Sequence, residues 1–214
     1  MYSGRMPTMR NTWSGGHTED QMLAQMGLVV FRTDPRSASG KGSGAAWTAY
    51  RQLGVQELKD ITEAIEWLKA KPFIDGARIG MSGHSYGGFI TAFSLTHSKL
   101  FAAGIAGAPV TDWRYYDSIY TERYMDLPKN NAEGYDGSSV VKAAKDLHGR
   151  LLLLHGMMDD NVHLQNATAL IDAFQKADRP FELMLYPQML HCLYGMHYHH
   201  QMIGFIERAL ELKK

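Results

Sequence analysis

The feature that most constrains the fold is an alternation of short apolar runs with amphipathic stretches along the chain. In the stretch 57–71, apolar residues recur at three- and four-residue spacing from Leu58 to Leu68, the pattern of a helix with one buried face. The run 151–154 consists of leucine alone, as expected for a strand covered on both faces. Strands that alternate with helices of this length indicate βαβ units and a mainly parallel sheet.

The periodicity assigns most of the chain to such elements. The predicted strands cover residues 27–31, 77–82, 101–108, 151–154 and 181–186. The predicted helices cover residues 57–71, 89–96, 164–177 and 200–212. The segment 112–145 is polar and rich in tyrosine, and the pattern assigns no element to it. Because no repeat, low-complexity tract or linker divides residues 1–214, we expect one α/β domain with helices on both faces of the sheet.

Composition excludes several classes of function. The chain carries 22 basic and 22 acidic residues, and a protein without excess positive charge is a poor candidate for binding nucleic acid or an anionic membrane. No stretch approaches the ~20 apolar residues that a transmembrane helix needs. The only cysteine is Cys192, so an intrachain disulfide is impossible and the compartment cannot be inferred from cysteine pairing. We therefore expect a small or neutral substrate.

The segment Gly83–Gly88 matches the G-x-S-x-G pattern of a nucleophile elbow. In that motif a serine occupies a tight strand-to-helix turn, and flanking glycines allow the chain to pass very close to itself. The alternative is an ordinary glycine-rich turn, but here an apolar strand precedes the motif and a helix follows it. The sequence therefore predicts Ser85 as a nucleophile, with the N–H of Tyr86 and the helix N-terminus directed at a developing oxyanion.

A candidate acid follows the leucine strand. In α/β-hydrolases the triad comes in the chain order serine, carboxylate, histidine. A carboxylate just beyond the C-terminal end of a strand lies at the same edge of the sheet as the elbow. Asp159 and Asp160 both satisfy this condition, and either could hold a histidine in its tautomer. The other would then be a solvated or helix-capping residue.

Five histidines follow the acid, and only one has the expected position. His191 comes after the last predicted strand and a turn at Pro187, at the C-terminal edge of the sheet, so it is the candidate base. The remaining four lie at the start of or within predicted helices: His163, His197, His199 and His200. The cluster at 197–200 resembles a metal site but lacks nearby carboxylate or cysteine partners, so we predict a surface or capping role, no metal and no cofactor.

Three blocks of the sequence resemble a known family: Gly83–Gly88, Tyr115–Met125 and His155–His163. From Tyr2 to the C-terminus the chain resembles the catalytic domain of the prolyl oligopeptidase family, and within it the dipeptidyl peptidase IV subfamily. The resemblance implies an α/β-hydrolase fold, Asp159 as the triad acid and His191 as the base. It also implies that Asn161 reaches the carbonyl group of the substrate.

The same resemblance assigns a pocket for the residue before the cleaved bond, the S1 pocket. Tyr116 and Tyr120 would line it, and an aromatic pocket suits the rigid proline ring, which loses little entropy on binding. Weaker candidates for the same pocket are Trp113, Val110 and Val140. The alternative for the two tyrosines is core packing. Tyr2 would add its hydroxyl to the Tyr86 N–H in the oxyanion hole.

Three departures from the family follow. The resemblance implies that family members carry an N-terminal β-propeller that binds the free amino terminus of the substrate, and we expect residues 1–214 to include neither the propeller nor the first strands of the hydrolase sheet. We therefore expect an N-terminally truncated hydrolase sheet and, because apolar surface is uncovered, a homodimer. Tyr2 lies at the extreme N-terminus, and Cys192 stands where the family usually has glycine, next to His191.

Three hypotheses for function result. The first is a serine peptidase that cleaves peptides after proline-like residues by acyl transfer. The second is a carboxylesterase, because nothing charged remains to anchor a peptide amino terminus and an open serine site cleaves small acyl esters. The third is a domain that only packs against partners, with a vestigial triad. Relatives act outside the cytoplasm or at its edge, so the resemblance implies a periplasmic or extracytoplasmic location for a full-length relative.

Overall fold

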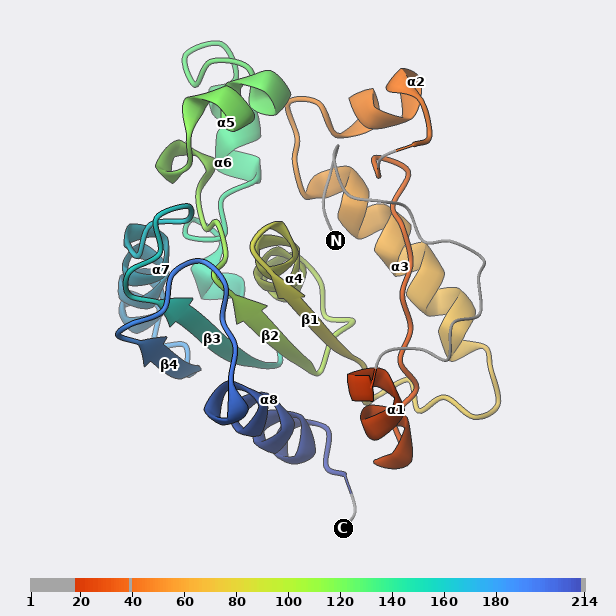
Figure 1. The fold of residues 1–214 in the computed structure, drawn as a ribbon. Coiled ribbons are helices and arrows are strands. Elements are labelled where there is room, and N and C mark those ends of the chain that lie inside the picture. The colour runs from red at the N-terminus through yellow and green to blue at the C-terminus, as the bar shows by residue number, and fades with distance from the viewer. Residues whose placement is uncertain (1–17, 39, 213–214) are drawn as a thin grey trace.

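The computed structural model describes residues 18–38 and 40–212. Within these residues a sheet of four parallel strands forms the centre of the molecule, in the same order as the chain (Figure 1). The strands are β1 (Gly80–His84), β2 (Ala103–Gly107), β3 (Arg150–Gly156) and β4 (Glu182–Tyr186). Because all four run in the same direction, their C-terminal ends meet at one edge of the sheet.

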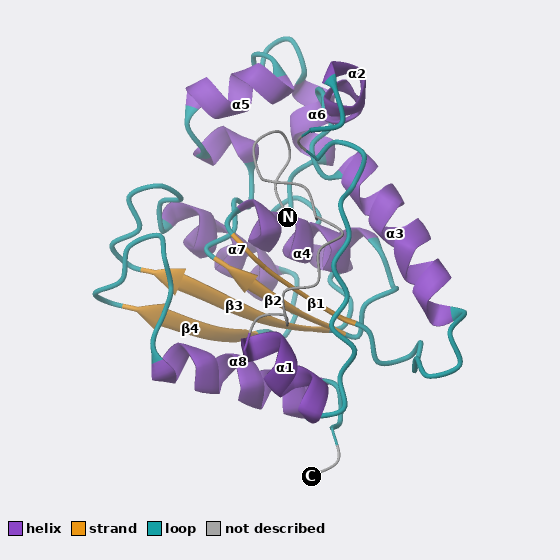
Figure 2. Cartoon of the chain, turned by 45° about the vertical axis from the view of Figure 1, so that its right-hand side comes forward, coloured by secondary structure: helices purple, strands orange, loops and turns teal. Residues whose placement is uncertain are grey.

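Helices cover both faces of the sheet (Figure 2). The crossover helices α4 (Tyr86–His97) and α7 (Gln165–Lys176) lie on one face, with α3 (Val55–Lys69) beyond α4. The helices α1 (Thr18–Gln25) and α8 (Met196–Ala209) lie on the other face. The prediction of a mainly parallel α/β sheet with helices on both faces is confirmed.

Strand β3 shows how the core is divided between the two faces. Leu151 and Leu153 pack into the cluster formed with α3, α4 and α7, whereas Leu152 and Leu154 pack into the cluster formed with α8. Successive side chains of a strand point to opposite faces, so a leucine run fills both cores at once. Full burial of each leucine stabilises the fold by about 1.5–3 kcal/mol.

The tyrosine-rich segment without an assigned element forms short helices above the C-terminal side of the sheet (Figure 1). They are a 3-10 turn at Trp113–Tyr115, α5 (Ser118–Met125), α6 (Ala132–Gly137) and a 3-10 turn at Ala144–Asp146. Asp117 caps α5, because its carboxylate accepts a 2.8 Å hydrogen bond from the N–H of Tyr120. A further short helix, α2 (Ser43–Ala46), continues into a 3-10 turn at Trp47–Ala49.

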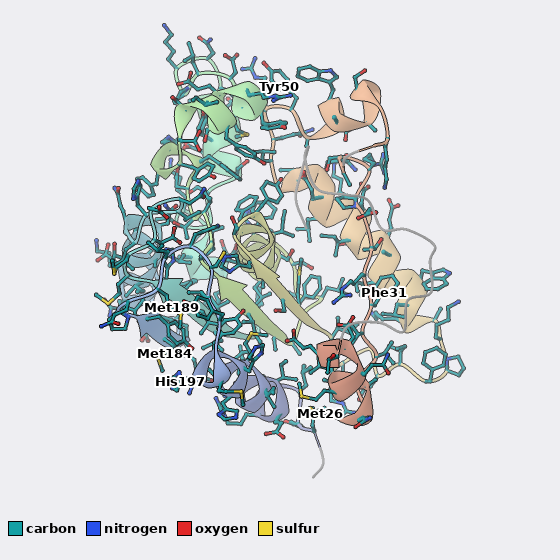
Figure 3. All side chains as sticks on the ribbon, in the orientation of Figure 1. Met26, Phe31, Tyr50, Met184, Met189 and His197 are labelled. Atoms are coloured by element: carbon teal, nitrogen blue, oxygen red, sulfur yellow. The ribbon has the colours of Figure 1, made fainter. Side chains whose placement is uncertain are left out.

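The prediction of a strand at 27–31 is wrong. This segment is irregular, and Val29, Val30 and Phe31 are exposed. An isolated extended segment has no ladder of hydrogen bonds, and among the described residues no strand lies beside it to supply one. Instead, Phe31 stacks on Trp67 of α3 with ring centroids 6.3 Å apart (Figure 3). Among residues 18–38 and 40–212, no helix is both long and apolar enough to cross a membrane.

Candidate active site

Ser85 occupies a strained turn between β1 and α4. Its φ is 60° and its ψ is −119°, a conformation that costs a non-glycine residue about 1–3 kcal/mol. The turn is closed by a 2.8 Å hydrogen bond from the Ser85 N–H to the carbonyl of Gly107 on β2. A Cβ atom on Gly83 would lie 2.4 Å from the main chain of Gly87, so only glycine fits there. The strand-turn-helix context expected of a nucleophile elbow is therefore present.

Three side chains from distant parts of the chain meet at the C-terminal edge of the sheet. The Ser85 Oγ lies 2.9 Å from Nε2 of His191, and Nδ1 of His191 lies 2.8 Å from Oδ2 of Asp159. These residues follow β1, β4 and β3 respectively, which brings them to one rim. In this arrangement the hydroxyl can donate to Nε2 while the Nδ1–H donates to the carboxylate. The imidazole is thus held in the tautomer that can accept a proton from the serine.

Asp159 is held as an anion. Its side chain is fully buried, and its Oδ1 accepts hydrogen bonds from the N–H groups of Asn161 at 3.0 Å and Val162 at 2.9 Å. Burial opposes ionisation, but the neighbouring His155 and His191 and the main-chain donors outweigh it and hold the pKa of this carboxyl far below its ordinary value. The adjacent Asp160 is exposed. The carboxylate in contact with the base is therefore Asp159.

His155 lies behind this carboxylate in β3. It is completely buried, with Nε2 2.8 Å from the carbonyl of Val162 and 3.4 Å from Oδ2 of Asp159. The loop from 159 to 162 is therefore closed from both ends: the Val162 N–H bonds to Asp159, and the Val162 carbonyl bonds to His155. This closure fixes the direction in which the carboxylate points.

The loop that carries His191 is docked on the end of β3. The N–H of Met158 donates to the carbonyl of Met189 at 3.1 Å. A Cβ atom on Gly156 would lie 2.3 Å from the carbonyl oxygen of Leu190, so the close approach of the loop depends on glycine at 156. The side chain of His191 remains 20% exposed, so a substrate can reach it from solvent.

Tyr86 is the first residue of α4, so its N–H is one of the donors at the start of that helix that have no partner within the helix itself. Its phenol hydroxyl reaches in the opposite direction and donates to Oε1 of the buried Glu57 at 3.0 Å. The same oxygen accepts from the hydroxyl of Ser37 at 3.0 Å, and Oε2 accepts from the N–H of Gly54 at 3.0 Å. Tyr2, the second predicted oxyanion donor, lies outside the described residues.

An aromatic cluster stands beside the site. The rings of Trp113, Tyr116 and Tyr120 lie 5.6–5.9 Å apart, centroid to centroid. Tyr86 also contacts this cluster, at 5.7 Å from Trp113, which links it to the serine turn. The hydroxyl of Tyr116 donates to Oδ1 of Asn161 at 2.9 Å. Two of the predicted substrate-binding residues are therefore in direct contact.

The other predicted pocket residues differ in accessibility. Val110, Trp113 and Val140 are buried, so in this structure they pack beneath the two half-buried tyrosines. Tyr116 and Asn161 open onto a polar pocket of about 400 Å³. The remaining residues of its wall are Arg114, Tyr115, Asp117, Asp160, His163 and Gln165. Assignment of these residues to substrate binding stays a prediction.

The other candidate histidines have contacts of their own. His163 lines the polar pocket, and His197 lies on α8, where its ring meets Tyr186 edge-on at 5.8 Å (Figure 3). Over residues 18–38 and 40–212, no group of three or more histidine, cysteine or acidic side chains is arranged to hold a metal ion.

Three residues around the site were not identified from the sequence: Glu57, His84 and His155. A glutamate three residues after a glycine at a helix start is a visible signal of N-terminal capping, but it does not reveal the contact with Tyr86. His84 and His155 lie within the sequence blocks that resemble the family, but neither residue has a role assigned from the sequence. No spacing rule assigns a role to such positions, so only the coordinates reveal their contacts.

The parallel sheet and the serine turn at its C-terminal edge define the fold as that of an α/β-hydrolase. Comparison with known proteins gives the family. Residues 13–213 match the prolyl oligopeptidase family, and the chain belongs to that family. The resemblance predicted from the three sequence blocks is confirmed.

Similar proteins are dipeptidyl peptidases. The chain is 42% identical over 192 residues to venom dipeptidyl peptidase 4 of Vespa velutina, covering 86% of this chain and 25% of that protein. It is 42% identical over 180 residues to a probable dipeptidyl-aminopeptidase B of Grosmannia clavigera, covering 82% and 18%. The crystal structure of Porphyromonas gingivalis dipeptidyl peptidase 4 matches with a TM-score of 0.78 and 41% identity, covering 84% of this chain and 26% of that one. The chain thus spans about a quarter or less of these relatives.

Proposed function

We propose that the chain is a serine peptidase that cleaves peptides after proline-like residues, in the manner of a dipeptidyl peptidase. The observation that supports this proposal most directly is the continuous hydrogen-bonded chain from Ser85 Oγ through His191 to Asp159. Membership of the prolyl oligopeptidase family and the names of the similar proteins point to the same class of reaction.

In the proposed mechanism His191 accepts the hydroxyl proton through Nε2 while the Ser85 Oγ attacks the scissile carbonyl carbon. The oxyanion forms beside the N–H of Tyr86 and the N-terminus of α4, which stabilise its negative charge. His191 then gives its proton to the leaving amine, and the acyl-enzyme remains. A water molecule, deprotonated by the same imidazole, hydrolyses the ester, and Asp159 stabilises the imidazolium in both steps.

For substrate binding we propose Tyr116 and Tyr120 as walls for a flat, rigid P1 ring such as proline, supported by Trp113, Val110 and Val140 from below. Asn161 has its Oδ1 occupied by the Tyr116 hydroxyl, so its amide NH₂ is oriented as a donor. A donor that opens onto the pocket beside Tyr116 suits a carbonyl oxygen of a bound peptide.

The test is active-site labelling with a fluorophosphonate together with turnover of an aminoacyl-prolyl anilide. The wild type is expected to label and turn over, and Ser85→Ala is expected to lose both, at least 10³-fold in kcat. Ser82→Ala, an exposed serine on β1, is the matched control and should behave like the wild type. Turnover by Ser85→Ala at the wild-type rate would refute the assignment. Hydrolysis of a short acyl ester but not of the anilide would favour the carboxylesterase instead.

We further propose that the chain self-associates, most simply as a homodimer, through apolar surface beside α3. Val29, Val30, Phe31 and Trp67 are exposed there, although they are large apolar side chains. Association would remove these grouped apolar side chains from water, which is favourable.

One relative is named as a venom protein, which agrees with an extracytoplasmic place of action for a longer relative.

A further inference from the structure

Packing against the ring of His191 restrains its imidazole. His191 lies in the irregular loop 187–195 between β4 and α8, in which Leu190 and Tyr194 are exposed. Its partners Asp159 and Ser85 bond to Nδ1 and Nε2. Rotation of the ring about the Cβ–Cγ bond would move both nitrogens away from these partners, so the two hydrogen bonds oppose it. A side chain packed against the ring opposes the same rotation and restrains the imidazole further.

His84 supplies that contact. Its ring centroid lies 4.8 Å from that of His191, with the two planes inclined by 55°. His84 is the last residue of β1 and precedes the serine, so its main chain is fixed by the sheet. A Cβ atom on Gly107 would lie 2.9 Å from Nδ1 of His84, which shows how closely the ring is seated against β2. The ring is therefore held between a rigid strand and the loop of the base.

We propose that His84 is a positioning residue that holds the imidazole of His191 at the angle needed to accept the Ser85 proton. This inference rests on the proposed function of the site and extends it to a residue that contacts the proposed base. Tilt of the imidazole moves Nε2 away from Oγ. Misplacement of a reacting group by about 1 Å lowers the rate by up to about 10²-fold.

The charge state of His84 fits this role. Burial, helped by repulsion from protonated His191, lowers the pKa of His84 to about 4. The titratable groups that face it are His191 on the loop, Asp159 after β3 and His155 within β3. Nε2 of His84 is buried and has no hydrogen-bond partner in the described part of the chain, so a proton there would be poorly stabilised. His84 is thus neutral over the range in which His191 must accept a proton.

The experiment compares His84→Ala and His84→Phe with the wild type on the anilide substrate. His84→Ala is expected to lower kcat by about tenfold to a hundredfold with KM within about twofold, because the base is misplaced but the substrate pocket is intact. His84→Phe keeps a ring against His191 and should retain kcat within about threefold. His97→Ala removes an exposed histidine ring that stacks on Phe93 at the other end of α4 from the serine, and it should leave kcat unchanged.

The pH dependence of kcat/KM distinguishes a positioning role of His84 from a general loss of folded structure in its variants. His84→Lys places a permanent charge beside His191 and should move the acid limb of kcat/KM to lower pH by about one unit, whereas His84→Phe should leave the limb in place. Wild-type kcat and pH limbs in His84→Ala would overturn the inference. So would a folded His84→Phe as slow as His84→Ala.

An NMR reading of the His191 ring distinguishes failure of this inference from failure of the proposed function. If the wild type shows no Ser85-dependent turnover, the proposed function fails. The Nδ1–H resonance of His191 still tests positioning in that case. It should be sharp in the wild type and in His84→Phe and should broaden in His84→Ala; an unchanged signal in His84→Ala would contradict the inference.

Discussion

Asp159 combines complete burial of its side chain with a negative charge. Four groups approach its two oxygens: two main-chain N–H groups and the rings of His155 and His191. A buried carboxylate is tolerated only when its oxygens are satisfied in this way. The same contacts that orient the proposed base therefore stabilise the folded state. They also make the free energy of unfolding depend on the protonation of Asp159, and hence on pH.

The pH dependence can be predicted from the direction of this shift. The folded pKa of Asp159 is depressed, so its contribution is present above the unfolded value of about 3.9 and is lost as pH falls below it toward the folded pKa. Wild type should exceed Asp159→Asn in free energy of unfolding at pH 7, and the difference should shrink between about pH 4 and pH 2. Urea unfolding at several pH values measures this. The exposed Asp160→Asn is the control, and a constant difference for Asp159→Asn would contradict the prediction.

At the residue scale, the G-x-S-x-G motif was enough to select Ser85 as a candidate, and chain order with the strand-end rule was enough to select His191. They could not choose between Asp159 and Asp160, because adjacent residues at the end of a strand have the same predicted location. The choice depends on which carboxylate the loop turns inward, and the Asn161 and Val162 N–H groups determine that. The tilted ring contact of His84 with the base depends on ring orientation, which periodicity does not encode.

At the scale of elements, the start of α3 is joined to the serine turn through one buried carboxyl group. Glu57 accepts the Gly54 N–H at the helix start and the hydroxyls of Ser37 and Tyr86. Burial raises its pKa, and the hydrogen bonds only partly counter this effect. Tyr86, the first residue of α4, is thus held by a hydrogen bond to Glu57 of α3.

Replacement of Glu57 should separate hydrogen bonding from shape. Glu57→Leu removes the oxygens that accept hydrogen bonds from three buried groups, and we expect a loss of about 3 kcal/mol in the free energy of unfolding. Glu57→Gln can accept from Gly54 and donate to the two hydroxyls, so its loss should stay below about 1 kcal/mol. Chemical denaturation measures both. Equal losses in the two variants would show that the hydrogen bonds are not responsible.

At the scale of elements, the sequence predicted correctly those helices and strands that have a buried face. The leucine run at 151–154 and the helical spacing at 57–71 reappear as β3 and α3, because each has a face that the core requires. The apolar run 27–31 has the composition of a strand, but pairing depends on a neighbour that composition cannot reveal. The helices of 112–145 are short and capped by local side chains such as Asp117, so they show little periodicity.

At the scale of the whole molecule, apolar surface beside α3 should lead to self-association. Phe31→Lys combined with Val29→Lys places charge in the centre of the exposed apolar group and should convert the dimer to a monomer at micromolar concentration. Light scattering coupled to size exclusion reads the mass. Ile119→Lys is the matched control, because Ile119 is 88% exposed on α5, and it should not alter the mass. A monomeric wild type would contradict the proposal.

The order of the strands determines when, during folding, the three side chains of the site can meet. Ser85, Asp159 and His191 stand on the ends of three different strands and are separated by as many as 106 residues of chain. None of their contacts can exist before β1, β3 and β4 lie in one sheet. A chain whose sheet is incomplete, during synthesis or after partial unfolding by heat, therefore lacks the proposed catalytic triad.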